Sequence, residues 1–104
     1  MFSTNVISIE RIQGERRPVS CRLNTPQGAD ISDMTASFIY KNELGQVVEQ
    51  GACVINGDII SVMLEHENNG TFTLLITCEV AGQIIRGMWR VMVHDTLIRP
   101  NSNP

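Results

Sequence analysis

The chain has 104 residues, of which 42% are hydrophobic and 18% are charged, and it carries a formal net charge of -3. This composition excludes a disordered chain, and no apolar run approaches the roughly 18 residues of a membrane span, so we expect one soluble domain without a membrane partner. A negative chain with a single lysine has no long-range attraction to phosphate backbones, which argues against nucleic acid as a partner.

Apolar and polar residues alternate in the N-terminal part of the chain, as they do on strands with one buried face. The alternation predicts strands at 6–12, 19–23 and 34–40, separated by segments rich in turn residues. Gly45 can adopt the positive φ that closes a short hairpin loop, so the third strand should return at 47–48.

Asn56-Gly57 is the strongest short turn signal in the chain. It predicts that 52–55 pairs back on 58–64. Straight counting from this turn then sets Gly51 and Glu49 opposite inward-facing apolar residues. We therefore expect a bulge or a strand edge in that region.

The clearest strand pattern lies towards the C-terminus, where two alternating stretches flank Ala81-Gly82. A two-residue hairpin loop sets Leu74 opposite Trp89 and faces the apolar residues of each stretch with those of the other. A one-residue slip would turn one of these sets to solvent. We therefore expect Trp89 to be buried in the core with Leu74, Phe72 and Phe38.

These elements predict an all-β fold, an immunoglobulin-like β-sandwich of about seven antiparallel strands with turns every 8 to 12 residues or so. The polar loop after Leu64 favours a sandwich over a small barrel, because it suits a crossing between two sheets. We expect a single domain over 1–98 and a flexible C-terminal tail over 99–104.

Five segments in this order resemble a known family: Asp30–Phe38, Gly45–Val48, Asn56–Ile59, Gly70–Phe72 and Trp89–Val93. An acidic, apolar loop leads into an Ala-x-Phe strand, a Gly-x-Val-Val hairpin follows, and a Gly-x-aromatic strand and a short apolar strand come late. This pattern is similar to the small immunoglobulin-like sandwich modules of tailed-bacteriophage particles, such as the amino-terminal module of baseplate upper proteins.

The resemblance implies a non-catalytic structural protein of the virion, used in head decoration, head–tail joining or the baseplate and made in the cytoplasm of the bacterial host. Its partners would be copies of itself and neighbouring virion proteins, with no cofactor and no small-molecule substrate. Two alternatives stay open: an intracellular adaptor or inhibitor domain with the same fold, and a small ligand-binding β-barrel. An enzyme is not expected, because the few histidines, cysteines and carboxylates suggest no catalytic constellation.

Three cysteines, Cys21, Cys53 and Cys78, could in principle join His66 or His94 as zinc ligands. Their irregular spacing lacks the close Cys-x-x-Cys pairs that structural zinc sites use. We expect unpaired, buried thiols, in keeping with a reducing compartment.

We expect the histidines and the acidic residues to be exposed to solvent. His66 lies in a predicted loop and His94 at a strand end, so both should be exposed instead of serving a Cys-His nucleophile. Glu65, Glu67 and Asp58 could hold a hard cation, but they lack the order of a calcium loop, and a solvated acidic loop is expected.

One candidate interface emerges from the outward phase of the last hairpin, where apolar side chains replace the expected polar ones. Its members are Leu75, Ile84, Arg86, Met88, Arg90 and Met92. Methionine and arginine are enriched at protein interfaces, so we expect contacts between molecules here. Arg16 and Arg17 form a second candidate, either a partner contact or a pair of charges that protects a strand edge.

Overall fold

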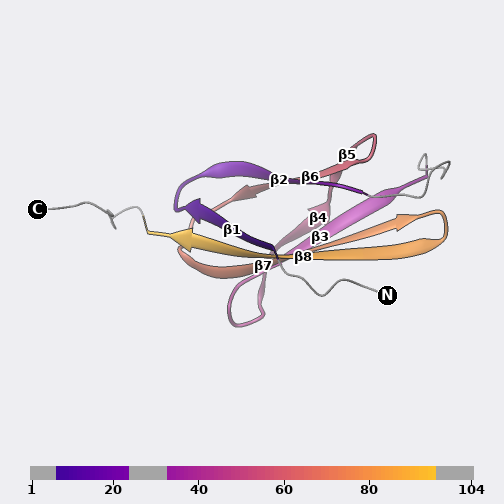
Figure 1. Ribbon diagram of the computed structural model, residues 1–104. Helices are drawn as coiled ribbons and strands as arrows, with labels where there is room; N and C mark the ends of the chain where they lie inside the picture. The colour runs from indigo at the N-terminus through magenta and orange to yellow at the C-terminus, as the bar shows by residue number, and fades with distance from the viewer. Residues whose placement is uncertain (1–6, 24–32, 96–104) are drawn as a thin grey trace, which may run out of the picture.

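The structure is a computed structural model that describes residues 7–23 and 33–95. Two β-sheets pack face to face (Figure 1). The strands are β1 (Ile7–Ile12), β2 (Arg16–Arg22), β3 (Thr35–Lys41), β4 (Val47–Ala52), β5 (Val54–Asn56), β6 (Ile59–Glu65), β7 (Gly70–Val80) and β8 (Gln83–His94). The described residues include no helix, and hence none that could span a membrane. The predicted tail, the turn-rich segment after 23 and the acidic loop before Asp33 lie outside this range.

The larger sheet has the strand order β1-β8-β7-β3-β4 and the smaller one β2-β6-β5. This confirms the predicted all-β sandwich, with eight strands among the described residues instead of about seven. The polar loop between β6 and β7 crosses from one sheet to the other, as expected. One pairing departs from the predicted antiparallel pattern, because β1 runs parallel to β8. β1 is an edge strand of the larger sheet, and the turn after it leads into the smaller sheet. No hairpin joins β1 to β8, so no tight turn requires the two strands to be antiparallel.

The β7–β8 hairpin has the predicted register. Val80 is opposite Gln83 and Leu74 is opposite Trp89. Ala81 and Gly82 both have positive φ, 52° and 76°, which is the conformation of a type I′ turn. This turn has the right-handed twist of the strands that it joins, and so it holds the pairing over the whole hairpin.

The chain changes sheets at Cys53, between β4 and β5. Before this point Gly51 and Glu49 pair with β3 of the larger sheet, and after it β5 pairs with β6 of the smaller one. The strand edge expected here is confirmed, because Gly51 and Glu49 never pair with β6. The turn predicted at Asn56-Gly57 is wrong by one residue, since Asn56 pairs with Ile59 and Gly57-Asp58 form the turn.

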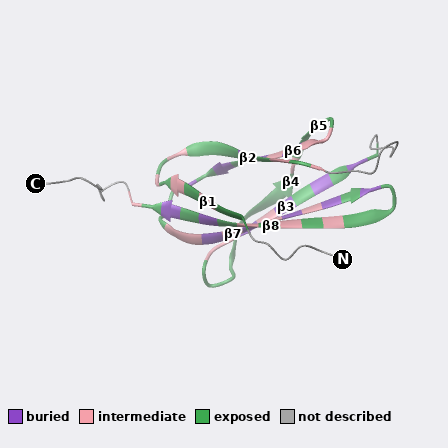
Figure 2. Cartoon of the chain, viewed as in Figure 1, coloured by how far each residue is buried: buried purple, intermediate pink, exposed green. Residues whose placement is uncertain are grey.

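Buried residues alternate with more exposed ones along β3, β6 and β7, whereas β4 and β5 are exposed throughout (Figure 2). Leu64 of the smaller sheet and Leu74 and Val91 of the larger one are fully inaccessible. Phe38 and Phe72 are also buried, as predicted. Burial of such side chains contributes about 1.5–3 kcal/mol each and is the main source of stability.

Trp89 departs from the prediction, because its side chain is only partly buried at the margin of the core. It faces the interior, but its neighbour in β1, Ile7, is 59% exposed. The smaller sheet has three strands against five, so it leaves part of the larger sheet's inner face uncovered. The Trp89 side chain therefore points towards the interior of the sandwich without being fully buried.

Candidate functional site

The register brings the apolar members of the predicted interface together on the outer face of the larger sheet. Leu75 is opposite Met88 on one side and opposite Ile39 of β3 on the other. These three side chains form one row across β8, β7 and β3. Met92 lies on the same face of β8, because it shares the phase of Met88.

The apolar side chains on this outer face lie among polar ones, and those of β8 are open to solvent. Ile84, Met88 and Met92 are 58%, 47% and 37% exposed. Arg86 and Arg90 are also exposed, and neither makes an ion pair within the described part of the chain. We call the six predicted residues Leu75, Ile84, Arg86, Met88, Arg90 and Met92 the hairpin face.

Arg16 and Arg17 lie away from the hairpin face, on β2 of the smaller sheet. Arg16 Nε is 3.2 Å from Glu65 Oε1, and Arg17 Nη1 is 3.4 Å from Glu15 Oε2. Because β2 is an edge strand, its place in the fold agrees with the role of protecting an edge. The two arginines and the hairpin face do not form one surface.

The outer face of the smaller sheet carries paired polar groups beside exposed apolar side chains, Met63 at 46% and Val54 at 68% exposure. There the hydroxyls of Ser20 and Ser61 lie 2.8 Å apart, and Arg22 Nε is 3.6 Å from Asp58 Oδ2. The polar groups of this sheet thus have partners of their own. What distinguishes the hairpin face is that Arg86 and Arg90 lie among its apolar side chains without an ion-pair partner among the described residues.

His66 is buried, with 2% of its surface exposed, so its prediction as a solvated loop residue is wrong. It follows directly after β6 and continues the inward phase of Val62 and Leu64. Its backbone is held on both sides by the turn after β1: His66 N–H donates to Glu15 O at 3.0 Å, and Gly14 N–H donates to His66 O at 2.7 Å. The phase of β6 was the sequence signal for this burial.

Tyr40 is the side-chain partner of His66, with its hydroxyl 3.4 Å from Nδ1. Burial raises the pKa of the Tyr40 hydroxyl. Burial also lowers the pKa of His66 below its ordinary value of 6.5, and the Arg11 guanidinium adds to this effect while Glu15 opposes it. At neutral pH the pair therefore consists of a neutral phenol and a neutral imidazole.

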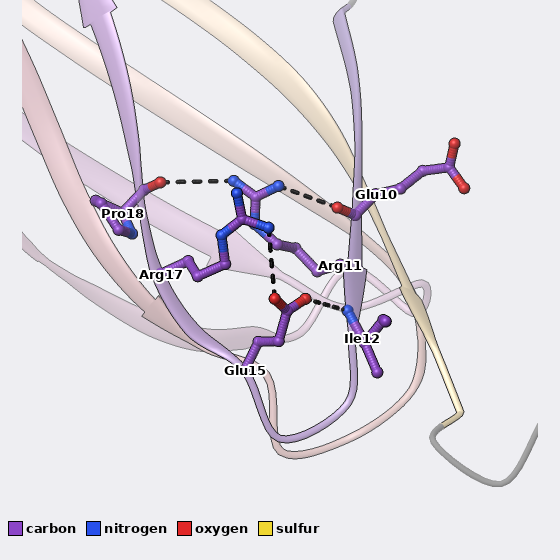
Figure 3. A network of polar contacts seen from close by, with 6 residues as sticks. All are labelled: Glu10, Arg11, Ile12, Glu15, Arg17 and Pro18. Carbon is purple, nitrogen blue, oxygen red and sulfur yellow. Dashed lines mark hydrogen bonds and ion pairs between the residues drawn. The ribbon is translucent and has the colours of Figure 1, made fainter.

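The turn between β1 and β2 is held by a network of polar contacts around Arg11 and Glu15 (Figure 3). The Arg11 guanidinium donates to Glu10 O at 3.0 Å and to Pro18 O of β2 at 3.5 Å, which links the two sheets. Glu15 Oε1 accepts a hydrogen bond of 2.6 Å from Ile12 N–H. This bond lowers the pKa of Glu15, desolvation opposes it, and the Arg17 guanidinium lowers the pKa further.

A cavity of about 310 Å³ opens beside His66. Its walls come from both sheets: Tyr40 and Phe72 from the larger one, and Glu65 at the end of β6 in the smaller one. The rings of Tyr40 and Phe72 are stacked, with centroids 5.1 Å apart and planes inclined by 16°. No pattern in the sequence predicted this cavity, because its walls come from strands far apart in the chain.

The three cysteines are free thiols, as predicted. Cys78 is buried, whereas Cys21 and Cys53 are only half-buried, which corrects the expectation that all three are buried. Burial raises the pKa of each thiol, that of Cys53 to about 11. Among residues 7–23 and 33–95, no group of three or more histidine, cysteine or acidic side chains is arranged to hold a metal ion.

The predicted acidic and histidine candidates are separated in the structure. Asp58 lies in the turn before β6 and Glu65 at the other end of that strand, and each pairs with an arginine of β2. His94 is exposed, and its Nε2 is 2.8 Å from Glu10 Oε1. His94 also lies at the end of β8 away from the region that pairs with Cys78, so no Cys-His pair forms there.

No protein-family model matches the sequence, and no curated protein does. Solved structures do match. CopC from Methylosinus trichosporium OB3b superposes with a TM-score of 0.68 at 12% identity, over 89% of each chain. The extracellular domain of the voltage-gated sodium channel β4 subunit has a TM-score of 0.54 at 16% identity, over 100% of this chain and 98% of that one. Tim-1 has a TM-score of 0.52 at 12% identity, over 93% and 99%.

These likenesses show the fold, an immunoglobulin-like β-sandwich. The structures serve unlike proteins, among them a channel subunit whose parallel homodimers are linked to cell–cell adhesion. At identities of 12–16% the shared property is the arrangement of strands. A function for this chain has to be argued from its own surfaces.

Proposed function

We propose that this protein is a non-catalytic assembly module that binds copies of itself and neighbouring proteins of a tailed-bacteriophage particle through the hairpin face. The observation that carries the proposal is the row formed by Met88, Leu75 and Ile39 on the outer face of the larger sheet. In a protein that acts alone, this outward phase would be polar.

The chemistry of the hairpin face suits protein contacts. Flexible methionines adapt to a partner's surface, and arginines add directional hydrogen bonds at the rim. Burying apolar surface at about 25 cal/mol per Å² supplies several kcal/mol, which the cost of association largely offsets. We therefore expect weak self-association in dilute solution and tighter assembly where many copies meet on a particle.

The assignment to a phage particle is based on the sequence resemblance. The order of segments from Asp30 to Val93 resembles sandwich modules of phage structural proteins, and the sandwich fold of the chain agrees with that resemblance. An adaptor or inhibitor domain acting inside a host cell would share the fold and the same face. The neighbouring genes distinguish the two, because phage structural genes cluster by assembly module.

The test replaces Met88 and Met92 together with lysine. Both side chains are exposed, so the double variant should keep its circular dichroism spectrum and its denaturation midpoint. Sedimentation of the wild-type chain across a range of concentrations should show self-association, and the double variant should remain monomeric. The matched control is Leu44→Lys with Val54→Lys, which adds the same charge at exposed apolar positions away from the hairpin face.

Two results would count against this proposal. A folded M88K/M92K protein that still associates would place the interface elsewhere. Equal loss of association in the Leu44 and Val54 control would mean that added charge alone disperses the protein, and the hairpin face would lose its special role.

A further inference from the structure

The cavity beside His66 lies on the inner side of the larger sheet, whereas the hairpin face is on the outer side. Three described carboxylates line it: Glu49 from β4, Glu65 from β6 and Glu67 from the following loop. No lysine or arginine within 7–23 and 33–95 lines it. Glu65 pairs with Arg16, while Glu49 and Glu67 form no ion pair with another described residue. The side chains that line the cavity therefore carry unbalanced negative charge, while the Arg11 guanidinium, which is not part of the lining, acts on His66 and Tyr40 with its positive charge.

A second, independent feature is an unsatisfied polar atom. His66 lines the cavity and is 2% exposed, and its Nε2 has no hydrogen-bond partner among the described residues. Its other ring nitrogen faces the Tyr40 hydroxyl at 3.4 Å. If the Nδ1 proton is donated to Tyr40, Nε2 is a free acceptor. A buried acceptor without a partner is unfavourable, and a bound donor would satisfy it.

The aromatic wall adds a third property. Tyr40 and Phe72 stack beside the same space, and aromatic rings attract cations as well as alkyl chains. A volume of about 310 Å³ is at the small end of ligand sites, and it fits one side chain or a small amine better than a nucleotide or a cofactor.

The surrounding strands leave room for an extended peptide. β4 is an edge strand of the larger sheet, and it contributes Glu49 to the cavity. In the smaller sheet, β5 pairs with β6 only at Ile59–Ser61, so the rest of β6 up to Glu65 has no strand on that side within the described residues. Open strand edges of this kind can pair with the backbone of a partner.

We propose that this cavity binds an organic cation, an alkylammonium or guanidinium group whose donors reach His66 Nε2 and the carboxylates of Glu49 and Glu67. The alkyl part of the ligand packs on Tyr40 and Phe72. The open edges beside the cavity favour a lysine or arginine side chain of a partner as the source, and a free amine has the same chemistry. This site is separate from the hairpin face and does not depend on it.

The probe is N-acetyl-lysine methylamide, and its matched control is N-acetyl-norleucine methylamide, which has the same alkyl chain without the ammonium group. Each is titrated into the full chain labelled with ¹⁵N, and the imidazole nitrogens of His66 are followed together with the backbone amides. The lysine compound should give saturable shifts at His66 Nε2 and at residues 49 and 67, and the norleucine compound should give none.

Two charge-matched double variants locate the site. Glu49→Gln with Glu67→Gln should weaken binding of the lysine compound at least tenfold. Glu10→Gln with Glu79→Gln removes the same charge from exposed positions on the outer face of the larger sheet and should leave binding unchanged. Titration with n-butylammonium identifies the source: binding as tight as that of the lysine compound indicates a free amine, and weaker binding indicates a side chain held by its backbone.

Three outcomes would overturn the proposal. The first is equal binding of the norleucine compound, which would make the cavity a purely apolar site. The second is an equal loss of affinity in the E10Q/E79Q variant, which would reduce the effect to the net charge of the protein. The third is the absence of saturable shifts at His66 with either cation.

Discussion

The indole of Trp89 lies directly over the backbone of Gly87, two residues earlier on the same face of β8. A Cβ placed on residue 87 would lie 2.7 Å from Cη2 and 2.9 Å from Cζ3 of this ring. Gly87 is also opposite Ile76 in the pairing with β7. The glycine is therefore what allows the ring to lie flat along the sheet at the margin of the core.

Gly87→Ala should destabilise the protein by about 1–3 kcal/mol, because the added methyl group forces the Trp89 ring out of its place. Chemical denaturation measures the change. Gly51→Ala is the matched control, since Gly51 is also a strand glycine without positive φ and a Cβ there would make an ordinary 3.5 Å contact with Cε1 of Phe38. We expect the free energy of unfolding of the control to stay within about 1 kcal/mol of wild type.

The explanation is checked by a double-mutant cycle with Trp89→Val. If the indole causes the cost of the Gly87 substitution, that cost should largely disappear when the ring is absent. An unchanged cost in the Trp89→Val background would show that the backbone of β8, not the contact with the ring, requires glycine.

Ala81→Asn should stabilise the protein by about 0.5–1 kcal/mol. Ala81 has a φ of 52°, a left-handed conformation that costs an alanine about 1 kcal/mol and that asparagine adopts more readily. Urea denaturation of the variant measures the gain. Ala81→Val is the comparison, because a β-branched residue tolerates this conformation worst and should lose stability. A loss of stability in A81N would contradict the assignment of a type I′ turn.

Replacing His66 with glutamine should flatten the pH dependence of stability below pH 6.5. The pKa of His66 is lowered in the folded state, so the unfolded chain takes up a proton near pH 6.5 that the folded protein does not yet bind. Stability from this group is complete above pH 6.5 and is lost as the pH falls through the lowered pKa. Denaturation at several pH values between 5 and 8 measures this slope.

His94→Gln is the control for this experiment, because His94 is exposed and lies outside the core. Its pH dependence between 5 and 8 should retain the component assigned to His66. The same slope in wild type and in H66Q would mean that the buried imidazole accepts a proton in the folded protein without cost.

The thiols should react slowly and in a definite order. A pKa of about 11 for Cys53, against an ordinary value of 9.0, reduces its thiolate at pH 8 by about 100-fold and slows alkylation accordingly. Cys78 is buried and should react only after unfolding, while Cys21 and Cys53 are half-buried and should react first. Mass spectrometry after timed alkylation, with and without urea, gives the order. Rapid labelling of Cys78 in the folded protein would contradict its burial.

The pairing of neighbouring strands could be predicted from the amino-acid sequence alone. A two-residue turn and the alternation on either side of it were sufficient to predict that Leu74 faces Trp89 and that Leu75 faces Met88. Both relationships depend only on residues within one hairpin, where the turn sets the register. For the same reason the members of the hairpin face could be predicted to share one side of the sheet.

What covers each face of a sheet depends on contacts between distant parts of the chain. Trp89 has inward phase but is partly exposed, because the smaller sheet does not extend over it. His66 was expected in solvent but is buried, because the turn after β1 closes over it with two backbone hydrogen bonds. The change of sheet at Cys53 and the cavity between the sheets likewise arise from strands distant in sequence. Burial depends on such non-local packing, and alternation within one strand does not specify it.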